Sequence, residues 1–185
     1  MHEAEAEPAA LLRAELERLR AAASAGPVLD LACGRGRNAL ALARAGLPVI
    51  GLDLDRERLE ALRASALAGA LPVALLRADL EAGARIPLAD ASCGAVVVFR
   101  YLHRALAREI VRVLAPGGLL LYETFTRSQR GIAQHPKNPA FLLEPGELPK
   151  LFAALEPLHV EEAVVSAPVP EAVARLVARK RGSPL

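Results

Sequence analysis

The stretch that decides the fold is VLDLACGRGRNALALA, residues 28–43. It begins with an apolar segment long enough for one buried strand, breaks at Gly34 and Gly36, and resumes with the alternating Ala and Leu of a helix. A strand that turns at glycines into a helix allows the backbone to approach a ligand closely and leaves free amide donors at the start of the helix. The stretch therefore predicts a ligand site between a buried strand and the helix that follows it.

Strand and helix patterns alternate along most of the remaining chain. Further strands are expected at residues 48–52, 73–76, 95–99 and 119–123, and helical patterns separate them, one of them capped by Asp55. Apolar strands that alternate with helices are typical of a parallel sheet covered on both faces. The expected fold class is therefore α/β, with a Rossmann-like doubly wound sheet.

Two later segments do not follow this alternation clearly. Residues 171–180 have helical propensity but could equally form an edge strand, and periodicity does not decide between the two. Residues 124–143 fit neither template, and their charged side chains are all basic. Long irregular loops in compact domains are often lids or binding loops, so a substrate lid is expected at 124–143, with a floppy surface insertion as the alternative.

Length and hydropathy limit the organisation of the chain. A chain of 185 residues is long enough for one core but too short for a cofactor domain and a second full domain. We expect a single domain over residues 1–185, in which residues 1–24 form a leading amphipathic helix. No apolar run is long enough to span a membrane and the N-terminus is acidic, which favours a cytoplasmic protein.

Composition and charge exclude several kinds of site. Cys33 and Cys93 have no CxxC spacing and no neighbouring His, so neither a disulfide framework nor a metal site is expected. A net charge of +2 does not require nucleic acid or a membrane as a partner. The scarcity of thermolabile Asn, Gln and Met is typical of a thermophilic source. Monomer and homodimer are both compatible with the sequence.

Three acids follow three of the predicted strands. Asp30 precedes the glycine turn. An extra negative charge there would not help to bind a pyrophosphate, but it would attract a cationic group of a ligand. Asp53 ends the second strand, where an acid in doubly wound folds accepts hydrogen bonds from ribose hydroxyls. Asp79 follows the third strand, where a carboxylate can accept the exocyclic amine of adenine. The three acids together favour an adenosine ligand with a cationic end.

These residues carry a resemblance to a known family. The order Asp30-Leu31-Ala32-Cys33-Gly34-Arg35-Gly36, then Asp53, then Ala78-Asp79-Leu80, then Leu114-Ala115-Pro116-Gly117-Gly118 resembles the signature of class I S-adenosylmethionine-dependent methyltransferases. The resemblance covers residues 25–125 and implies a seven-stranded sheet whose last strand is antiparallel, which would make the ambiguous tail a hairpin. It also implies S-adenosylmethionine as cofactor and S-adenosylhomocysteine as product.

The resemblance assigns roles to the matching positions. Asp30 and the turn from Gly34 to Gly36 would receive the methionine portion, Asp53 the ribose, and Asp79 with Leu80 the adenine. The cofactor-binding residues expected on this basis are Asp30, Ala32, Cys33, Gly34, Gly36, Asn38, Asp53, Leu54, Asp79, Leu80 and Phe99.

The acceptor side in this fold is formed by the segments after the fourth and fifth strands. His103 and Arg104 are expected in the first turn of the helix that follows the fourth strand, where His103 could act as a base near neutral pH or could simply pack. His103 and Tyr101 are the candidate catalytic residues. Arg104, Arg108 and Arg112 recur at helical spacing, which is typical of a solvated ridge. The candidate substrate residues are Arg100, Arg104, Glu123, Phe125, Arg127 and Asn138.

Residues 122–127 and 136–148 further resemble a bacterial subgroup described as tellurite-resistance-like methyltransferases. That resemblance does not identify a substrate. The basic lid favours a small polar or anionic acceptor, methylated by direct in-line displacement.

Two other functions share part of these features. An NAD-dependent oxidoreductase would also use the glycine turn and Asp53, but it would gain nothing from Asp30 and Asp79. A noncatalytic cofactor-binding or RNA-associated protein is supported only by the arginine ridge and by the basic run 179–181.

Overall fold

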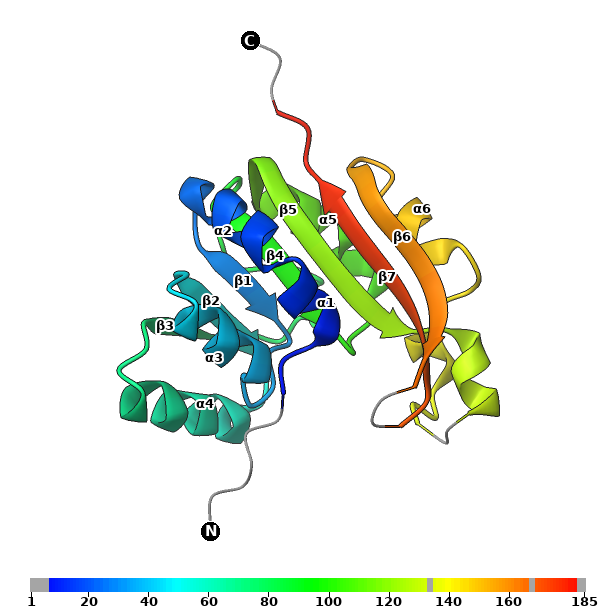
Figure 1. Ribbon diagram of the computed structural model, residues 1–185, viewed down its shortest axis with the longest axis horizontal. Helices are drawn as coiled ribbons and strands as arrows, with labels where there is room; N and C mark the ends of the chain where they lie inside the picture. Colours follow the sequence, from blue (N-terminus) through cyan, green and yellow to red (C-terminus); the bar gives the residue numbers. More distant parts are fainter. Residues whose placement is uncertain (1–6, 133–134, 167–168, 183–185) are drawn as a thin grey trace.

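A seven-stranded sheet forms the centre of the computed structural model, which describes residues 7–132, 135–166 and 169–182. The strand order is β3-β2-β1-β4-β5-β7-β6 (Figure 1). β1 to β5 are parallel to one another, and β7 runs antiparallel to both of its neighbours, β5 and β6. The strands are β1 (Val28–Leu31), β2 (Val49–Asp53), β3 (Val73–Arg77), β4 (Cys93–Phe99), β5 (Leu114–Phe125), β6 (Glu156–Val165) and β7 (Glu171–Arg179). The predicted α/β fold class and the antiparallel last strand are confirmed.

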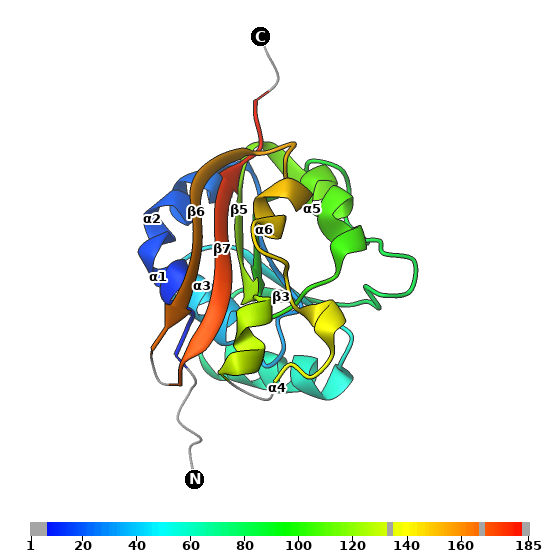
Figure 2. The same cartoon turned by 90° about the vertical axis from the view of Figure 1, so that its right-hand side faces the viewer.

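Helices cover the two faces of this sheet, as the edge-on view shows (Figure 2). Residues of the first four helices belong to one apolar cluster with inward-facing strand residues, and those of the last two belong to the other. The first group is α1 (Ala10–Ala14), α2 (Leu16–Ala22), α3 (Arg37–Arg44) and α4 (Arg56–Ala68); the second is α5 (Ala107–Val113) and α6 (Glu147–Leu151). Short 3-10 helices are η1 (Ala23–Ala25), η2 (Arg104–Leu106), η3 (Arg127–Gly131) and η4 (Pro139–Phe141).

Burial of β1 and β4 explains why the middle of the sequence reads as continuous apolar runs. Every residue of both strands is buried, because each strand has a neighbour on both edges and helices on both faces. Asp30 is the one charged residue in β1, and it is only 2% exposed.

The leading helix is shorter than predicted and is interrupted. Residues 1–6 lie outside the described part of the chain, and α1 begins only at Ala10 because Ala9 is extended and donates its amide to Asn38 Oδ1 at 2.9 Å. Glu15 leaves helical geometry between α1 and α2. A tertiary contact, absent from any local pattern, therefore sets the start of this helix.

The tail and the lid also differ from their sequence patterns. Residues 171–179 form β7, an interior strand rather than a helix or an edge strand, because β5 and β6 pair with its two edges. Residues 124–143 are more ordered than a loop: β5 continues to Phe125, η3 and η4 follow, and Thr126 forms a bridge with Leu143. Residues 133–134 of this stretch lie outside the described part.

Candidate active site

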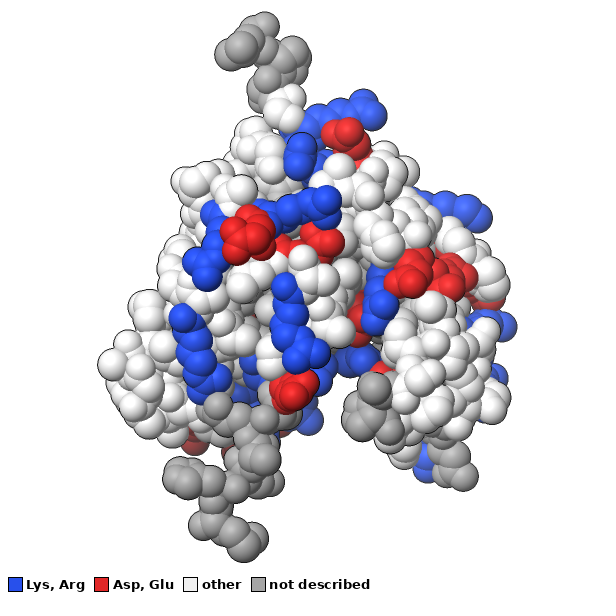
Figure 3. Space-filling model, in the orientation of Figure 1, with Lys and Arg blue, Asp and Glu red and all other residues white. Residues whose placement is uncertain are grey.

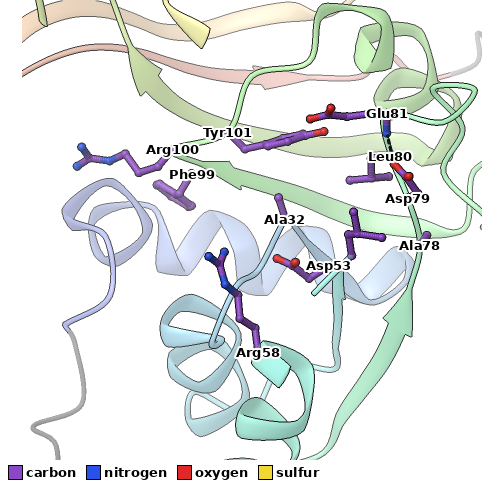
Figure 4. Close-up of a pocket in the computed structure, with 11 residues that line it drawn as sticks. Ala32, Asp53, Arg58, Ala78, Asp79, Leu80, Glu81, Phe99, Arg100 and Tyr101 are labelled. Carbon is purple, nitrogen blue, oxygen red and sulfur yellow. Dashed lines mark hydrogen bonds between the residues drawn. The ribbon is translucent and has the colours of Figure 1, made fainter. Parts of the chain in front are cut away.

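A pocket of about 230 Å³ opens at the carboxyl ends of the parallel strands (Figure 4). Its walls come from the segments that follow β1, β2, β3 and β4 and from the first turn of α4. In open parallel sheets this edge is where ligands bind. The lining residues are Ala32, Asp53, Leu54, Arg58, Ala78, Asp79, Leu80, Glu81, Phe99, Arg100 and Tyr101.

The glycine turn after β1 has backbone conformations that favour glycine. Gly34 has φ +57° and Gly36 has φ +82°, both in the left-handed region. A Cβ at Gly36 would collide with the side chain of Leu62 on α4, whereas a Cβ at Gly34 would meet no atom within 4 Å. Gly36 therefore allows α3 and α4 to pack closely, and Gly34 leaves open space beside the backbone.

Asp53 links the glycine turn to the end of β2. Its Oδ2 accepts the Gly34 amide at 2.7 Å, and its Oδ1 accepts the Asp55 amide at 2.9 Å. The residue is only 8% exposed, yet it lines the pocket. A carboxylate held by two backbone amides is rigid, and each oxygen retains capacity to accept a further hydrogen bond.

Asp79 holds the loop after β3 in a turn at the opposite wall of the pocket. Its Oδ1 accepts the amides of Glu81 at 2.9 Å and Ala82 at 3.0 Å. Asp79 is exposed, and no described residue forms a hydrogen bond with its Oδ2. That oxygen is available to a ligand.

Asp30 lies behind the turn, buried against α3, and does not line the pocket. Burial raises the pKa of its carboxyl from 3.8 to about 7, opposed by the Ala39 backbone and the Arg37 charge. Among the described residues none hydrogen-bonds to Asp30 Oδ2. A buried carboxyl oxygen without a partner is costly, and a nearby cationic ligand group would offset that cost.

Arg100 begins the segment after β4 and is held from several sides. Its backbone has φ +59°, an uncommon conformation for a residue with a side chain, and its amide donates to Glu123 O at 2.9 Å. The guanidinium lies 4.8 Å above the Phe125 ring, pairs through Nη2 with Glu123 Oε1 at 3.3 Å, and pairs through Nη1 with Glu171. The predicted substrate residues Arg100, Glu123 and Phe125 are thus brought together.

Tyr101 lies in the pocket wall, with its hydroxyl next to the carboxylate of Glu81 in Figure 4. Burial raises the pKa of the Tyr101 hydroxyl to about 12, and the negative charges of Glu81, Asp79 and Asp53 add to the shift. At neutral pH the hydroxyl is therefore protonated, so Tyr101 can donate a hydrogen bond but does not act as a base.

His103 lies outside the pocket. It precedes η2 in an extended conformation, so the prediction that it starts a helix is wrong; the first helical residue is Arg104. Its Nε2 is buried and has no hydrogen-bond partner in the described part of the chain. This nitrogen is not presented to a ligand in the pocket.

The predicted cofactor residues Cys33 and Asn38 face other parts of the protein. Asn38 is buried, and its Oδ1 accepts the Ala9 amide, so its side chain binds the leading segment rather than the pocket. The Cys33 thiol contacts Gly34 O at 3.7 Å, and burial raises its pKa. Their side chains support the turn from behind.

The arginines and the asparagine of the lid region have protein partners. Arg104 forms a bidentate pair with Glu147 at 2.5 and 2.9 Å and donates to two carbonyls of the η4 segment. Arg127 pairs with Glu144 at 2.6 Å, and Asn138 caps η4 through the Ala140 amide. These three predicted substrate residues thus hold residues 124–147 together.

The expected arginine ridge is also mostly paired. Arg112 binds Asp90 at 2.6 Å and Glu109 at 2.7 Å and donates to the carbonyls of Ile86 and Leu88. On the opposite face of the sheet, drawn in Figure 3, acidic side chains also lie beside basic ones. The expectation of a solvated ridge is wrong for Arg104 and Arg112.

Three pocket residues were missed in the sequence. Ala78 and Glu81 flank the predicted pair Asp79-Leu80 in the sequence. Because the four residues are consecutive, the whole loop could have been expected to line the pocket. Arg58 has no such signal: it reaches the pocket because Asp55 caps α4 through the amides of Glu57 and Arg58.

Residues 28–118 match the family described as "Methyltransferase domain". Residues 28–118 therefore form a methyltransferase domain of the S-adenosylmethionine-dependent kind. The match contains the glycine turn, the three acids and the pocket lining. S-adenosylmethionine is the cofactor of this methyltransferase family. Among the described residues, no helix is long and apolar enough to cross a membrane.

Relatives agree with this assignment of the methyltransferase domain. The chain is 35% identical over 126 residues to ubiquinone/menaquinone biosynthesis C-methyltransferase UbiE of Syntrophotalea carbinolica, covering 64% of this chain and 48% of the relative. It is 38% identical over 110 residues to the uncharacterized protein Rv1405c of Mycobacterium tuberculosis, covering 55% and 39% of the two chains. The chain thus spans about half, or less, of the length of these curated relatives.

Solved structures share the fold of the methyltransferase domain. TehB from Haemophilus influenzae superimposes with a TM-score of 0.71 at 22% identity, covering 89% of this chain and 62% of that one. Geranyl diphosphate C-methyltransferase from Streptomyces coelicolor, solved with S-adenosyl-L-homocysteine, gives 0.68 at 16% identity, covering 91% and 77%.

Proposed function

We propose that this protein transfers a methyl group from S-adenosylmethionine to a small polar acceptor. The observation that carries the proposal is the carboxylate of Asp53, held by the amides of Gly34 and Asp55 at the pocket wall. It supports ribose binding because a fixed pair of acceptor oxygens suits two adjacent hydroxyls.

The other acids fit the remaining parts of the same cofactor. Asp79 has an oxygen available for the amino group of adenine, beside the apolar side chain of Leu80. Asp30, which precedes the glycine turn, has a buried oxygen that no described residue hydrogen-bonds, and the positive charge of the methionine ammonium group would stabilise its ionised form. When bound, the cofactor supplies a methyl group whose bond to sulfur breaks, with the electron pair retained by sulfur, as a nucleophilic acceptor atom forms a bond to the methyl carbon.

The protein's part in this reaction is chiefly positioning. An in-line displacement needs the acceptor atom behind the methyl group, and holding two reactants in that geometry contributes up to about 7–11 kcal/mol. Phe99, Arg100 and Tyr101 line the side of the pocket where the acceptor would approach. The Tyr101 hydroxyl is protonated at neutral pH and can donate a hydrogen bond to the acceptor.

Calorimetry with S-adenosylhomocysteine and with NAD tests this proposal. We expect S-adenosylhomocysteine to bind and Asp53→Ala to weaken binding by about 1–3 kcal/mol, because a buried charged acceptor of hydrogen bonds is lost. Asp90→Ala is the matched control, since Asp90 is an exposed aspartate that does not line the pocket. Binding of NAD without S-adenosylhomocysteine would favour the oxidoreductase instead.

A further inference from the structure

We propose that the acceptor carries an amine or another cationic group and that Glu81, in the wall of the pocket, binds this group. The inference rests on the proposed methyl transfer and adds the chemical class of the acceptor. It replaces the anionic acceptor that the basic lid sequence favours.

The guanidinium groups of the pocket are already neutralised by the protein. Arg58 pairs with Asp55 at 3.1 Å, on the same turn of α4. Arg100 pairs with Glu171 and with Glu123, and Glu123 is only 3% exposed. An anionic acceptor would have to displace one of these carboxylates to reach a positive charge, so the pocket offers little to attract a carboxylate or phosphate.

The acids of the pocket, unlike its arginines, form no ion pair with a described residue. Asp53 and Asp79 each accept two backbone amides and are assigned to the cofactor. Glu81 also lines the pocket, is exposed, and has a carboxylate that forms no hydrogen bond or ion pair with any described residue. The uncompensated charge on the pocket wall is therefore negative, and it lies at Glu81.

The surroundings of Glu81 suit an ammonium group. The Tyr101 hydroxyl lies next to the Glu81 carboxylate in Figure 4, and the Tyr101 ring forms part of the same wall. Glu81 can supply the opposite charge and accept N–H donors, and an aromatic face attracts cations. Burial is the main reason that the pKa of the Tyr101 hydroxyl is raised, and the negative charges of Glu81, Asp79 and Asp53 act in the same direction.

The basic side chains of residues 104–137 do not add a positive charge to the pocket wall. Arg104 and Arg127 are paired with Glu147 and Glu144, and Arg130 and Lys137 are exposed and do not line the pocket. The absence of acids within 124–143 is compensated by acids that follow in the sequence and fold back onto the lid.

Matched amines and carboxylates test the inference in the presence of saturating S-adenosylhomocysteine. The probes are phenethylamine and 3-phenylpropionate, and benzylamine and benzoate, with binding followed by NMR of the protein. We expect each amine to bind more tightly than its carboxylate, and Glu81→Gln to weaken amine binding by about fivefold, the size of an ion pair at a partly exposed site. Glu81→Lys should reverse the preference.

The control is Glu57→Gln, an exposed glutamate on α4 outside the pocket, which should leave the binding of both classes unchanged. Tighter binding of the carboxylates, binding of neither class, or no effect of Glu81→Gln would overturn the inference. A loss of affinity in Glu81→Gln for S-adenosylmethionine but not for S-adenosylhomocysteine would overturn it too, because Glu81 would then serve the sulfonium. Failure of S-adenosylhomocysteine to bind at all would instead reject the proposed methyl transfer.

Discussion

Asp30 occupies a buried position where a charged carboxylate is unfavourable. Burial raises its pKa from 3.8 to about 7, so in the folded protein the neutral form is favoured across that range. The folded state therefore binds more protons than the unfolded state between these pH values, and the contribution of Asp30 to stability falls as pH rises from 3.8 to about 7.

Asp30→Asn should remove this dependence. At about pH 8 we expect the variant to be more stable than the wild type by on the order of 2 kcal/mol in urea unfolding, because no buried charge forms.

In the wild type, S-adenosylhomocysteine should bind with release of protons near pH 7, because its ammonium group favours the charged form of the Asp30 carboxyl. Calorimetry in buffers of different ionisation enthalpy measures that release; equal release in Asp30→Asn would contradict the assignment.

At the scale of elements, α3 connects the leading segment to the glycine turn. Arg37 and Asn38 form its first turn, and both bind the segment before α1: Asn38 accepts the Ala9 amide at 2.9 Å, and Arg37 donates to Glu7 O at 3.4 Å. The segment that precedes α1 is thus fixed to the helix that begins at the cofactor turn. No local sequence pattern records this contact, because Ala9 and Asn38 are 29 residues apart.

Asn38→Ala should loosen the leading segment. The change leaves the buried Ala9 amide without its acceptor, which costs about 1–3 kcal/mol of folding free energy. Hydrogen exchange of the amides in residues 9–14 should accelerate, whereas Asn38→Asp, which retains an acceptor oxygen, should preserve most of the protection. Asn138→Ala, which removes an exposed cap on η4, is the control for loss of an asparagine. Unchanged exchange in Asn38→Ala would show that the contact does not hold the segment.

Across the whole molecule, charged side chains form a row of ion pairs from β6 across β7 and β5 to the residue after β4. Glu161 on β6 pairs with Arg175 on β7 at 2.9 Å, Arg175 pairs with Glu123 on β5 at 2.7 Å, and Glu123 reaches Arg100 after β4. The register that places Arg175 opposite both Glu123 and Glu161 makes these contacts possible. This row of ion pairs connects the pocket to the edge of the sheet.

Glu123→Gln should destabilise the protein by about 3 kcal/mol, because Arg100 and Arg175 both lose the buried carboxylate that they share. The double variant Glu123→Gln/Arg175→Gln should recover part of that loss, and denaturant unfolding of the two single variants and the double variant gives the coupling free energy. Additive losses would show that the Glu123–Arg175 pair is not coupled.

Much of the parallel half of this sheet was predictable from local pattern. Strands buried on both faces read as apolar runs, and the residue that ends each run, such as Asp53 or Asp79, is placed at the same sheet edge by parallel pairing alone. The pocket therefore contains the acids that the sequence predicted for it, except Asp30, which lies behind the turn.

The sequence by itself determined the α/β class, the glycine turn and the acids beside it, because these depend on periodicity and on the conformational freedom of glycine. Only the tertiary structure decided that residues 171–179 are an interior strand and that Arg104 and Arg127 are paired. Partners such as Glu147 for Arg104 are distant in sequence, and no local pattern records which distant carboxylate folds back to neutralise a charge. The same pairing leaves Glu81 unpartnered at the pocket among the described residues.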